Sequence, residues 1–133
     1  MTLWRSGAAP DWRDWAFAGM IGWFWSVPVG LVLWGVAVAV GQMSAEAALI
    51  PMAASLFLLF APAFSWLGLV LALPVAVAAA RRGLFGPASA ALIGATAGGM
   101  AAGILGGTDA RVVAAFGAVT LVLIWAALRL IRR

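Results

Sequence analysis

The sequence predicts an all-helical, polytopic membrane protein with four transmembrane helices, short loops and both termini in the cytoplasm. Hydrophobic residues make up 66% of the 133 residues, charged residues make up 9%, and the mean hydropathy is +1.13. A soluble domain usually has roughly 45–50% apolar and about 25% charged residues, so this chain lacks the polar surface of one. Its uncharged residues fall in four long stretches, 16–40, 47–80, 83–108 and 112–128. The length predicts one integral-membrane domain over residues 1–133.

Residues 1–18 are expected to form an interfacial segment at the membrane surface. Trp12 and Trp15 lie three positions apart on one face of a short helix, and tryptophan prefers the headgroup level of a bilayer. The apolar run that follows is longer than the roughly 7–15 residues of a secretory signal. We therefore expect it to remain in the protein and to cross the membrane at about residues 19–40.

The second apolar stretch, residues 47–80, is too long for one ordinary span of about 20 residues. A helix of this length would measure about 50 Å, against a hydrocarbon core of about 30 Å. Prolines interrupt it at Pro51, Pro62 and Pro74. We expect a helical lead-in at 45–59, a kink near Pro62 and a span at 60–80. The alternatives are one tilted, kinked helix, a re-entrant segment, or a fifth span with the N-terminus outside.

Arginines gather at the ends of these stretches that share one side of the membrane. Arg81 and Arg82 follow the second stretch, and Arg129 with two terminal arginines follows the fourth. With one span in the second stretch, both clusters fall on the same side as the arginines of the N-terminal segment. The opposite side keeps a single arginine, Arg111. Because positive residues mark the cytoplasmic side, four spans with both termini inside are favoured.

The third stretch, with an expected span at 87–107, carries two parallel rows of small residues spaced four apart. The rows are Ala90, Gly94, Gly98, Ala102 and Gly106, and Ala91, Ala95, Gly99, Gly103 and Gly107. Lipid provides no hydrophobic drive for helices to associate, so close backbone approach at small residues must provide it. We predict a helix-packing interface at Gly94, Gly98, Gly99, Ala102, Gly103 and Gly106. This interface is expected either to pack against the first and fourth spans or to associate with another copy or a partner subunit.

The fourth span is expected at residues 110–130. Small residues at Ala110, Ala114 and Ala118 repeat the four-residue spacing more weakly. Tryptophan and arginine at the end of a span prefer the headgroup level. We therefore predict membrane-interface anchors at Trp12, Trp15, Arg81, Arg82, Trp125 and Arg129.

Three polar residues that precede expected helices are typical N-caps: Asp11, Ser44 and Asp109. Glu46 lies in the first turn after Ser44, where an acid interacts favourably with the helix dipole. The short link 106–109 suits a tight hairpin between the third and fourth spans.

Hydroxyl side chains inside the spans are expected to bond to carbonyls of the preceding turn. They belong to Ser26, Ser55, Ser65, Thr96 and Thr120. Ser26 precedes Pro28 and Ser65 follows Pro62, so we expect these two to satisfy carbonyls that the prolines leave without a donor. No base stands near any of them in the sequence, which gives no support to a serine nucleophile.

The residue types needed for most membrane chemistry are missing. The chain has no Cys, His, Lys or Tyr, which excludes disulfides, thiolate or imidazole ligation of metals and haem, and Schiff-base cofactors. Its four acids all flank the apolar stretches, and an ionisable group deep in the bilayer would be the default functional site. We therefore expect no enzyme activity, no catalytic residue, no cofactor and no metal.

The expected function is that of a non-catalytic membrane subunit or assembly factor within a larger bacterial membrane complex. The alternatives are a small homo-oligomeric channel or transporter and, less favoured, a holin-like or toxin-like pore former. Expected partners are membrane lipids and other membrane subunits or a second copy. The net charge of +4 resides in arginines at span ends, which gives no basic stripe for nucleic acid. Arginine without lysine, with abundant alanine and glycine, favours a bacterial protein of the inner membrane, crossing it several times.

Overall fold

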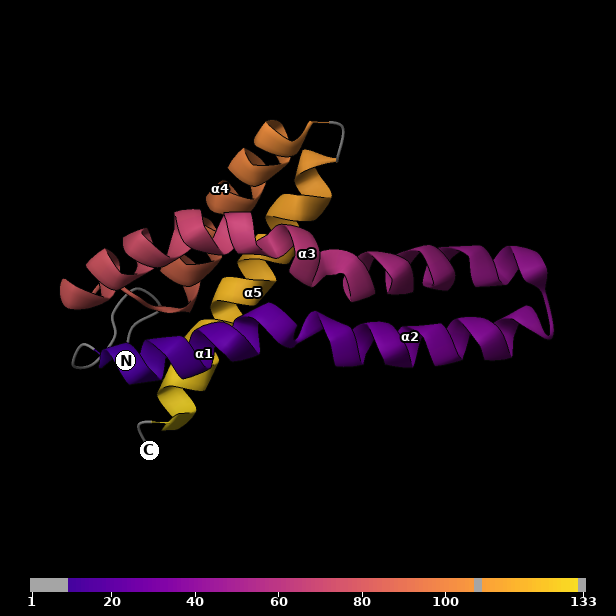
Figure 1. The fold of residues 1–133 in the computed structure, drawn as a ribbon, viewed down its shortest axis with the longest axis horizontal. Helices are drawn as coiled ribbons and strands as arrows, with labels where there is room; N and C mark the ends of the chain where they lie inside the picture. The colour runs from indigo at the N-terminus through magenta and orange to yellow at the C-terminus, as the bar shows by residue number, and fades with distance from the viewer. Residues whose placement is uncertain (1–9, 107–108, 132–133) are drawn as a thin grey trace. The chain divides into compact units, whose positions relative to one another are not determined.

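The computed structural model describes residues 10–106 and 109–131, and the regular structure in these residues is helical (Figure 1). The helices are α1 (Trp12–Phe24), α2 (Ser26–Gly41), α3 (Ala45–Arg81), α4 (Pro87–Leu105) and α5 (Ala110–Ile131). Four stretches are long and apolar enough to cross a membrane: Trp12–Gly41, Ala45–Arg81, Pro87–Leu105 and Ala110–Ile131. The predicted all-helical class with four such helices is confirmed. The loops, the kink and the in–out topology stay predictions.

The first apolar run forms two helices. α1 begins inside the expected interfacial segment and ends at Phe24, and a turn at Trp25 precedes α2. Pro28 accounts for the interruption, because it has no N–H for the carbonyl of Phe24, four residues earlier, and its ring crowds that carbonyl. Trp25 keeps φ −56° and ψ −30°, so the backbone stays close to helical through the turn. Residues 1–9 of the expected interfacial segment lie outside the described residues.

The second apolar stretch forms one helix, α3, of 37 residues. The expected lead-in and span are therefore parts of one continuous element, about 55 Å long at 1.5 Å per residue. Ser44 begins it as predicted, because its Oγ accepts the N–H of Ala47 at 3.4 Å. Proline at three positions costs the helix three backbone hydrogen bonds without ending it.

Aspartate side chains also accept backbone N–H groups at the start of α5 and of α1. Asp109 Oδ1 accepts the N–H of Arg111 at 2.9 Å, which confirms the predicted cap of α5. At the start of α1, the N–H of Asp11 donates to Oδ2 of Asp14 at 3.3 Å. In a capping box, this is the bond in which the side chain of the third helical residue accepts the backbone N–H of the N-cap residue. Gly107, the last residue of the expected third span, lies outside the described residues, as does Thr108.

The chain folds as two compact units, Met1–Trp23 with Ser65–Arg133 and Phe24–Phe64. The second unit, Phe24–Phe64, contains α2 and the N-terminal half of α3 side by side as an antiparallel hairpin (Figure 1). A Cβ added at Gly30 would lie 3.0 Å from Cγ of Leu59, and one at Gly41 would lie 3.5 Å from Cβ of Ala48. The two helices therefore stay in contact from end to end.

The first unit contains a hydrophobic core to which distant parts of the sequence contribute. Every helix of the unit contributes to that core: Trp15, Ala18, Leu69, Ala72, Ala76, Ala80, Phe85, Ala90, Ala97, Leu121, Ile124, Ala127 and Leu128. The rings of Trp15 and Phe85 meet with centroids 5.3 Å apart at 52°. Alanine is the commonest core residue on α3 and α4. The prediction of one membrane domain over residues 1–133 stays a prediction.

Candidate helix-packing surface

The α4 and α5 helices touch through their backbones. A Cβ added at Gly94 would overlap the carbonyl oxygen of Gly117 and would lie 2.9 Å from Cα of Ala118. A Cβ added at Gly98 would overlap the carbonyl oxygen of Val113. Both glycines are buried. We call Gly94, Gly98 and Gly117 the glycine seam, and only glycine allows the approach seen there.

Gly117 was not among the residues predicted from the sequence. A Cβ added to it would overlap the carbonyl oxygen of Gly94 and would lie 3.3 Å from Cα of Gly98. It is the one glycine of the stretch 112–128, and a single glycine within an apolar helix is a sequence feature that could have indicated a close helix contact. The predicted row on this helix consisted of alanines spaced four apart, and Gly117, three positions after Ala114, does not fit that spacing.

In the second small-residue row of α4, the described residues leave two glycines without a close neighbour. A Cβ added at Gly99 or Gly103 would meet no atom within 4 Å. Ala91, Ala95 and Gly99 are half-buried and Gly103 is exposed. We call these four residues the open row. The two rows of one helix therefore differ, since the glycines of one meet the backbone of α5 and the described glycines of the other have no close neighbour.

The six residues of the predicted interface fall into two groups. Gly94, Gly98 and Ala102 are buried, whereas Gly99, Gly103 and Gly106 are not. Gly106 ends α4 at φ 62° and donates its N–H to the carbonyl of Ala102 at 3.1 Å. It belongs to the helix end, where a left-handed backbone favours glycine.

A third close contact joins α1 to α5. A Cβ added at Gly22 would overlap Cγ1 of Ile124 and would lie 2.6 Å from its Cδ1. Here the neighbour is the flexible end of a side chain, whereas in the glycine seam it is backbone. The α1 contact is therefore able to relax more easily than the α4–α5 contact.

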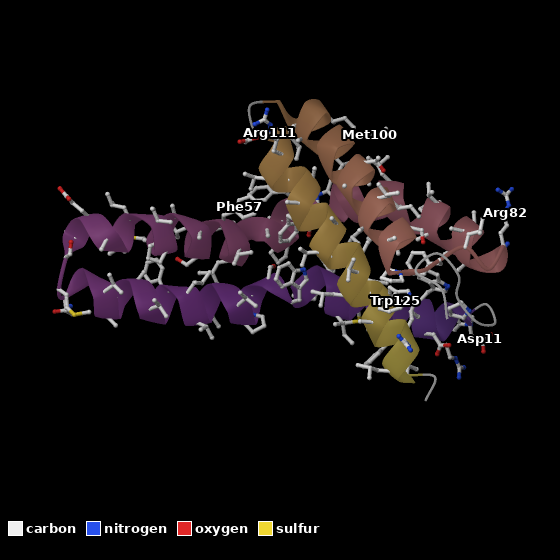
Figure 2. The ribbon with its side chains drawn as sticks, turned by 180° about the vertical axis from the view of Figure 1, so that it is seen from behind. Asp11, Phe57, Arg82, Met100, Arg111 and Trp125 are labelled. Carbon is white, nitrogen blue, oxygen red and sulfur yellow. The ribbon has the colours of Figure 1, made fainter. Side chains whose placement is uncertain are left out.

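The predicted interface anchors occupy different surroundings. Trp12 is 74% exposed, with the guanidinium of Arg13 at 5.6 Å from its ring centroid, whereas Trp15 is 9% exposed against Phe85. Trp125, labelled in Figure 2, is half-buried and has the guanidinium of Arg129 at 5.5 Å.

Arg81 and Arg82 are exposed at the end of α3. Among the tryptophans, Trp12 is exposed and Trp15 is buried, although the two lie three positions apart in the same helix. The role of these six residues as anchors stays a prediction.

Two of the predicted hydroxyl contacts are confirmed. Ser55 donates to the carbonyl of Met52 at 2.7 Å, and Thr96 donates to the carbonyls of Leu92 and Ile93 at 2.9 and 3.0 Å. Each hydroxyl thereby finds its partner in the preceding turn of its own helix.

The prediction was wrong for Ser26 and Ser65, whose buried Oγ atoms have no hydrogen-bond partner among the residues that the structure describes. Ser26 is the first residue of α2 and follows the turn at Trp25 instead of a regular helical turn. The carbonyl that Pro62 leaves without a donor is that of Leu58, seven residues before Ser65 and beyond its reach.

The acids lie at helix N-termini. Glu46 and Asp109 are exposed. Asp11, labelled in Figure 2, lies at the start of α1 and donates its N–H to Oδ2 of Asp14. Within residues 10–106 and 109–131, no group of three His, Cys, Asp or Glu side chains is close enough to hold a metal ion. Comparisons with protein-family models, curated proteins and solved structures find no match to the chain.

Proposed function

We propose that this chain is a non-catalytic membrane subunit or assembly factor, and that the open row of α4 receives a helix of its partner. The observation that carries the proposal is the contrast between the two rows of α4. Gly94 and Gly98 meet the backbone of α5, whereas a Cβ at Gly99 or Gly103 meets nothing within 4 Å. Two adjacent rows of small residues make a face wide enough for two neighbours, and α5 occupies one half of it.

Membrane physics favours a helix as the occupant of the open row. Helices associate in lipid through dispersion, which needs backbones at close range, and small residues supply that range. Lipid chains also cover a smooth face, but they gain nothing special from glycine at two positions one turn apart. The apolar composition of α4 fits an occupant inside the bilayer, and the short loops leave little surface for one outside it.

The distribution of charge supports a non-catalytic role. The described acids lie at the first turns of helices, where they cap or complement the helix dipole. An enzyme would need a base and an acid within reach of a pocket, and a proton-coupled transporter would need a carboxylate inside a span.

The proposed location is the bacterial inner membrane, with partners that are other membrane subunits.

The test is purification of the tagged chain from its host in a mild detergent, followed by native mass spectrometry. An added Cβ at Gly99 or Gly103 meets no described atom within 4 Å, so we expect leucine at either position to fill the open row, to leave the chain folded and to release the partner. Leucine at Gly35 is the matched control, because this α2 glycine also has no atom within 4 Å of an added Cβ.

Three results would contradict the proposal. One is retention of the partner by both Gly99→Leu and Gly103→Leu at the wild-type level. The second is equal loss of the partner in Gly35→Leu, because the effect would then not belong to the open row. The third is an assembly made of copies of this chain alone, which favours the homo-oligomeric channel or transporter.

A further inference from the structure

A shallow apolar depression runs along the last turns of α3 and ends at two arginines. Its lining residues are Leu73, Pro74, Val77, Ala78, Arg81 and Arg82. They follow one another at intervals of one and three residues, so they form a double row on one face of the helix. From first to last the face extends about 13 Å along the axis. The small side chain of Ala78 lies between Pro74 and Arg82 in one of the two rows.

The end of α3 leaves both guanidinium groups available. Gly83, at φ 70°, terminates the helix, with its own N–H donating to the carbonyl of Ala80 at 2.9 Å and that of Leu84 donating to Ala79 at 2.8 Å. This Schellman motif satisfies the last carbonyls with backbone donors, so arginine side chains are not needed for that purpose.

Both arginines are exposed, and Figure 2 shows Arg82 extending away from the helix end. No ion pair or side-chain hydrogen bond joins Arg81 or Arg82 to another of the described residues. The lining of the depression contains no acid, so its charge is purely positive. Two cations that have no acidic partner among the described residues, at the end of an apolar face, attract an anion that also has an apolar part.

We propose that this depression binds a phospholipid with an anionic headgroup. The phosphate lies between Arg81 and Arg82, and one acyl chain lies along Leu73, Pro74, Val77 and Ala78. Arginine binds phosphate through two parallel N–H donors, which makes paired arginines well suited to a phosphodiester. At the end of a span the guanidinium groups extend to headgroup depth while their stems stay in the apolar region. The inference needs the span but does not depend on the subunit role.

The test measures binding of phosphatidylglycerol and phosphatidylcholine to the purified full chain in detergent, by native mass spectrometry. We expect phosphatidylglycerol to bind more tightly. The double variant Arg81→Gln/Arg82→Gln should weaken that binding about 25-fold, since each interfacial arginine contributes about fivefold. The matched control is Arg111→Gln/Arg129→Gln, which removes the same charge elsewhere and should change binding less than twofold.

A second variant tests the apolar half of the site. Ala78 is exposed, so Ala78→Leu fills the depression without disturbing the core or the charge. It should weaken phosphatidylglycerol binding several-fold while leaving the helix content unchanged by circular dichroism.

The proposal is overturned if the two lipids bind equally, or if the control double variant loses as much lipid as the test variant. It is also overturned if inorganic phosphate at the same concentration displaces the lipid. The site would then recognise a free anion and not a phospholipid.

Discussion

Alanine at Gly94 tests the closest contact of the structure. A Cβ at this position would overlap the carbonyl oxygen of Gly117 and would lie 2.6 Å from the carbonyl carbon. Ordinary van der Waals contact begins near 3.4 Å, so α4 and α5 must separate locally by at least 0.8 Å. Neither helix is able to rotate a side chain away, because the obstacle is backbone.

The magnitude follows from two opposing effects. Overpacking a close-packed contact costs about 1–3 kcal/mol, and a gap of 0.5–1 Å removes roughly a quarter to a half of the dispersion energy along the contact. Alanine is favoured over glycine within a helix by up to about 1 kcal/mol. We therefore expect Gly94→Ala to lower the free energy of unfolding by about 1–2 kcal/mol.

Gly99→Ala is the control, because it makes the same substitution in the same helix where the added atom meets nothing. It keeps the gain in helix propensity and has no overlap, so the difference between the two variants isolates the overlap, about 1–3 kcal/mol. The assay is reversible unfolding in mixed micelles with increasing sodium dodecyl sulfate, followed by tryptophan fluorescence. Equal stability of the two variants would refute the close α4–α5 contact.

Three further substitutions test other parts of the chain in the same assay. Ser26→Ala should be neutral or stabilising, because the Oγ that it removes is buried and unpartnered; a loss above about 1 kcal/mol would reveal a bond to that hydroxyl. Phe85→Ala should cost about 3–5 kcal/mol and shift the emission of Trp15 to the red, since the ring is 2% exposed and packs at a tilt against that indole; an unchanged spectrum would contradict this packing. Ser44→Ala should cost about 1 kcal/mol by removing the N-cap of α3, whereas Ser44→Asp should retain most of the stability; equal losses would speak against capping.

Hydropathy and capping rules predicted the helical elements well. Apolar runs bounded by charge locate helices because backbone groups in an apolar setting must be paired within their own segment. Ser44 and Asp109 were recognisable as caps because their partners are two or three residues away in the chain. Information of this kind is local, and a single sequence contains it.

Proline effects were less predictable. Pro28 coincides with a break after Phe24, whereas the three prolines of α3 leave that helix continuous. A proline removes one hydrogen bond at every site, but whether the helix ends depends on what else surrounds the freed carbonyl. The sequence shows where a hydrogen bond is lost, but it does not show what surrounds the freed carbonyl.

The candidate surface shows the same limit. The two rows of α4 look alike in the sequence, and the difference between Gly94 and Gly99 arises from Gly117, which lies 23 residues beyond Gly94. Trp15 similarly resembles Trp12 until Phe85, 70 residues away, covers its ring. Periodicity indicates which residues share a face, but only the neighbouring helix determines which face is filled.

The glycine seam leaves the chain without a conservative replacement. Every other amino acid carries the Cβ that would overlap a backbone carbonyl at Gly94, Gly98 or Gly117, so no missense change at these three codons is mild. At Gly99 and Gly103 the same atom meets no described atom within 4 Å, and tolerance there depends on what covers them in the cell. A saturation scan scored in the native host would therefore locate a bound neighbour, because substitutions would not be tolerated on a surface that the described residues leave free.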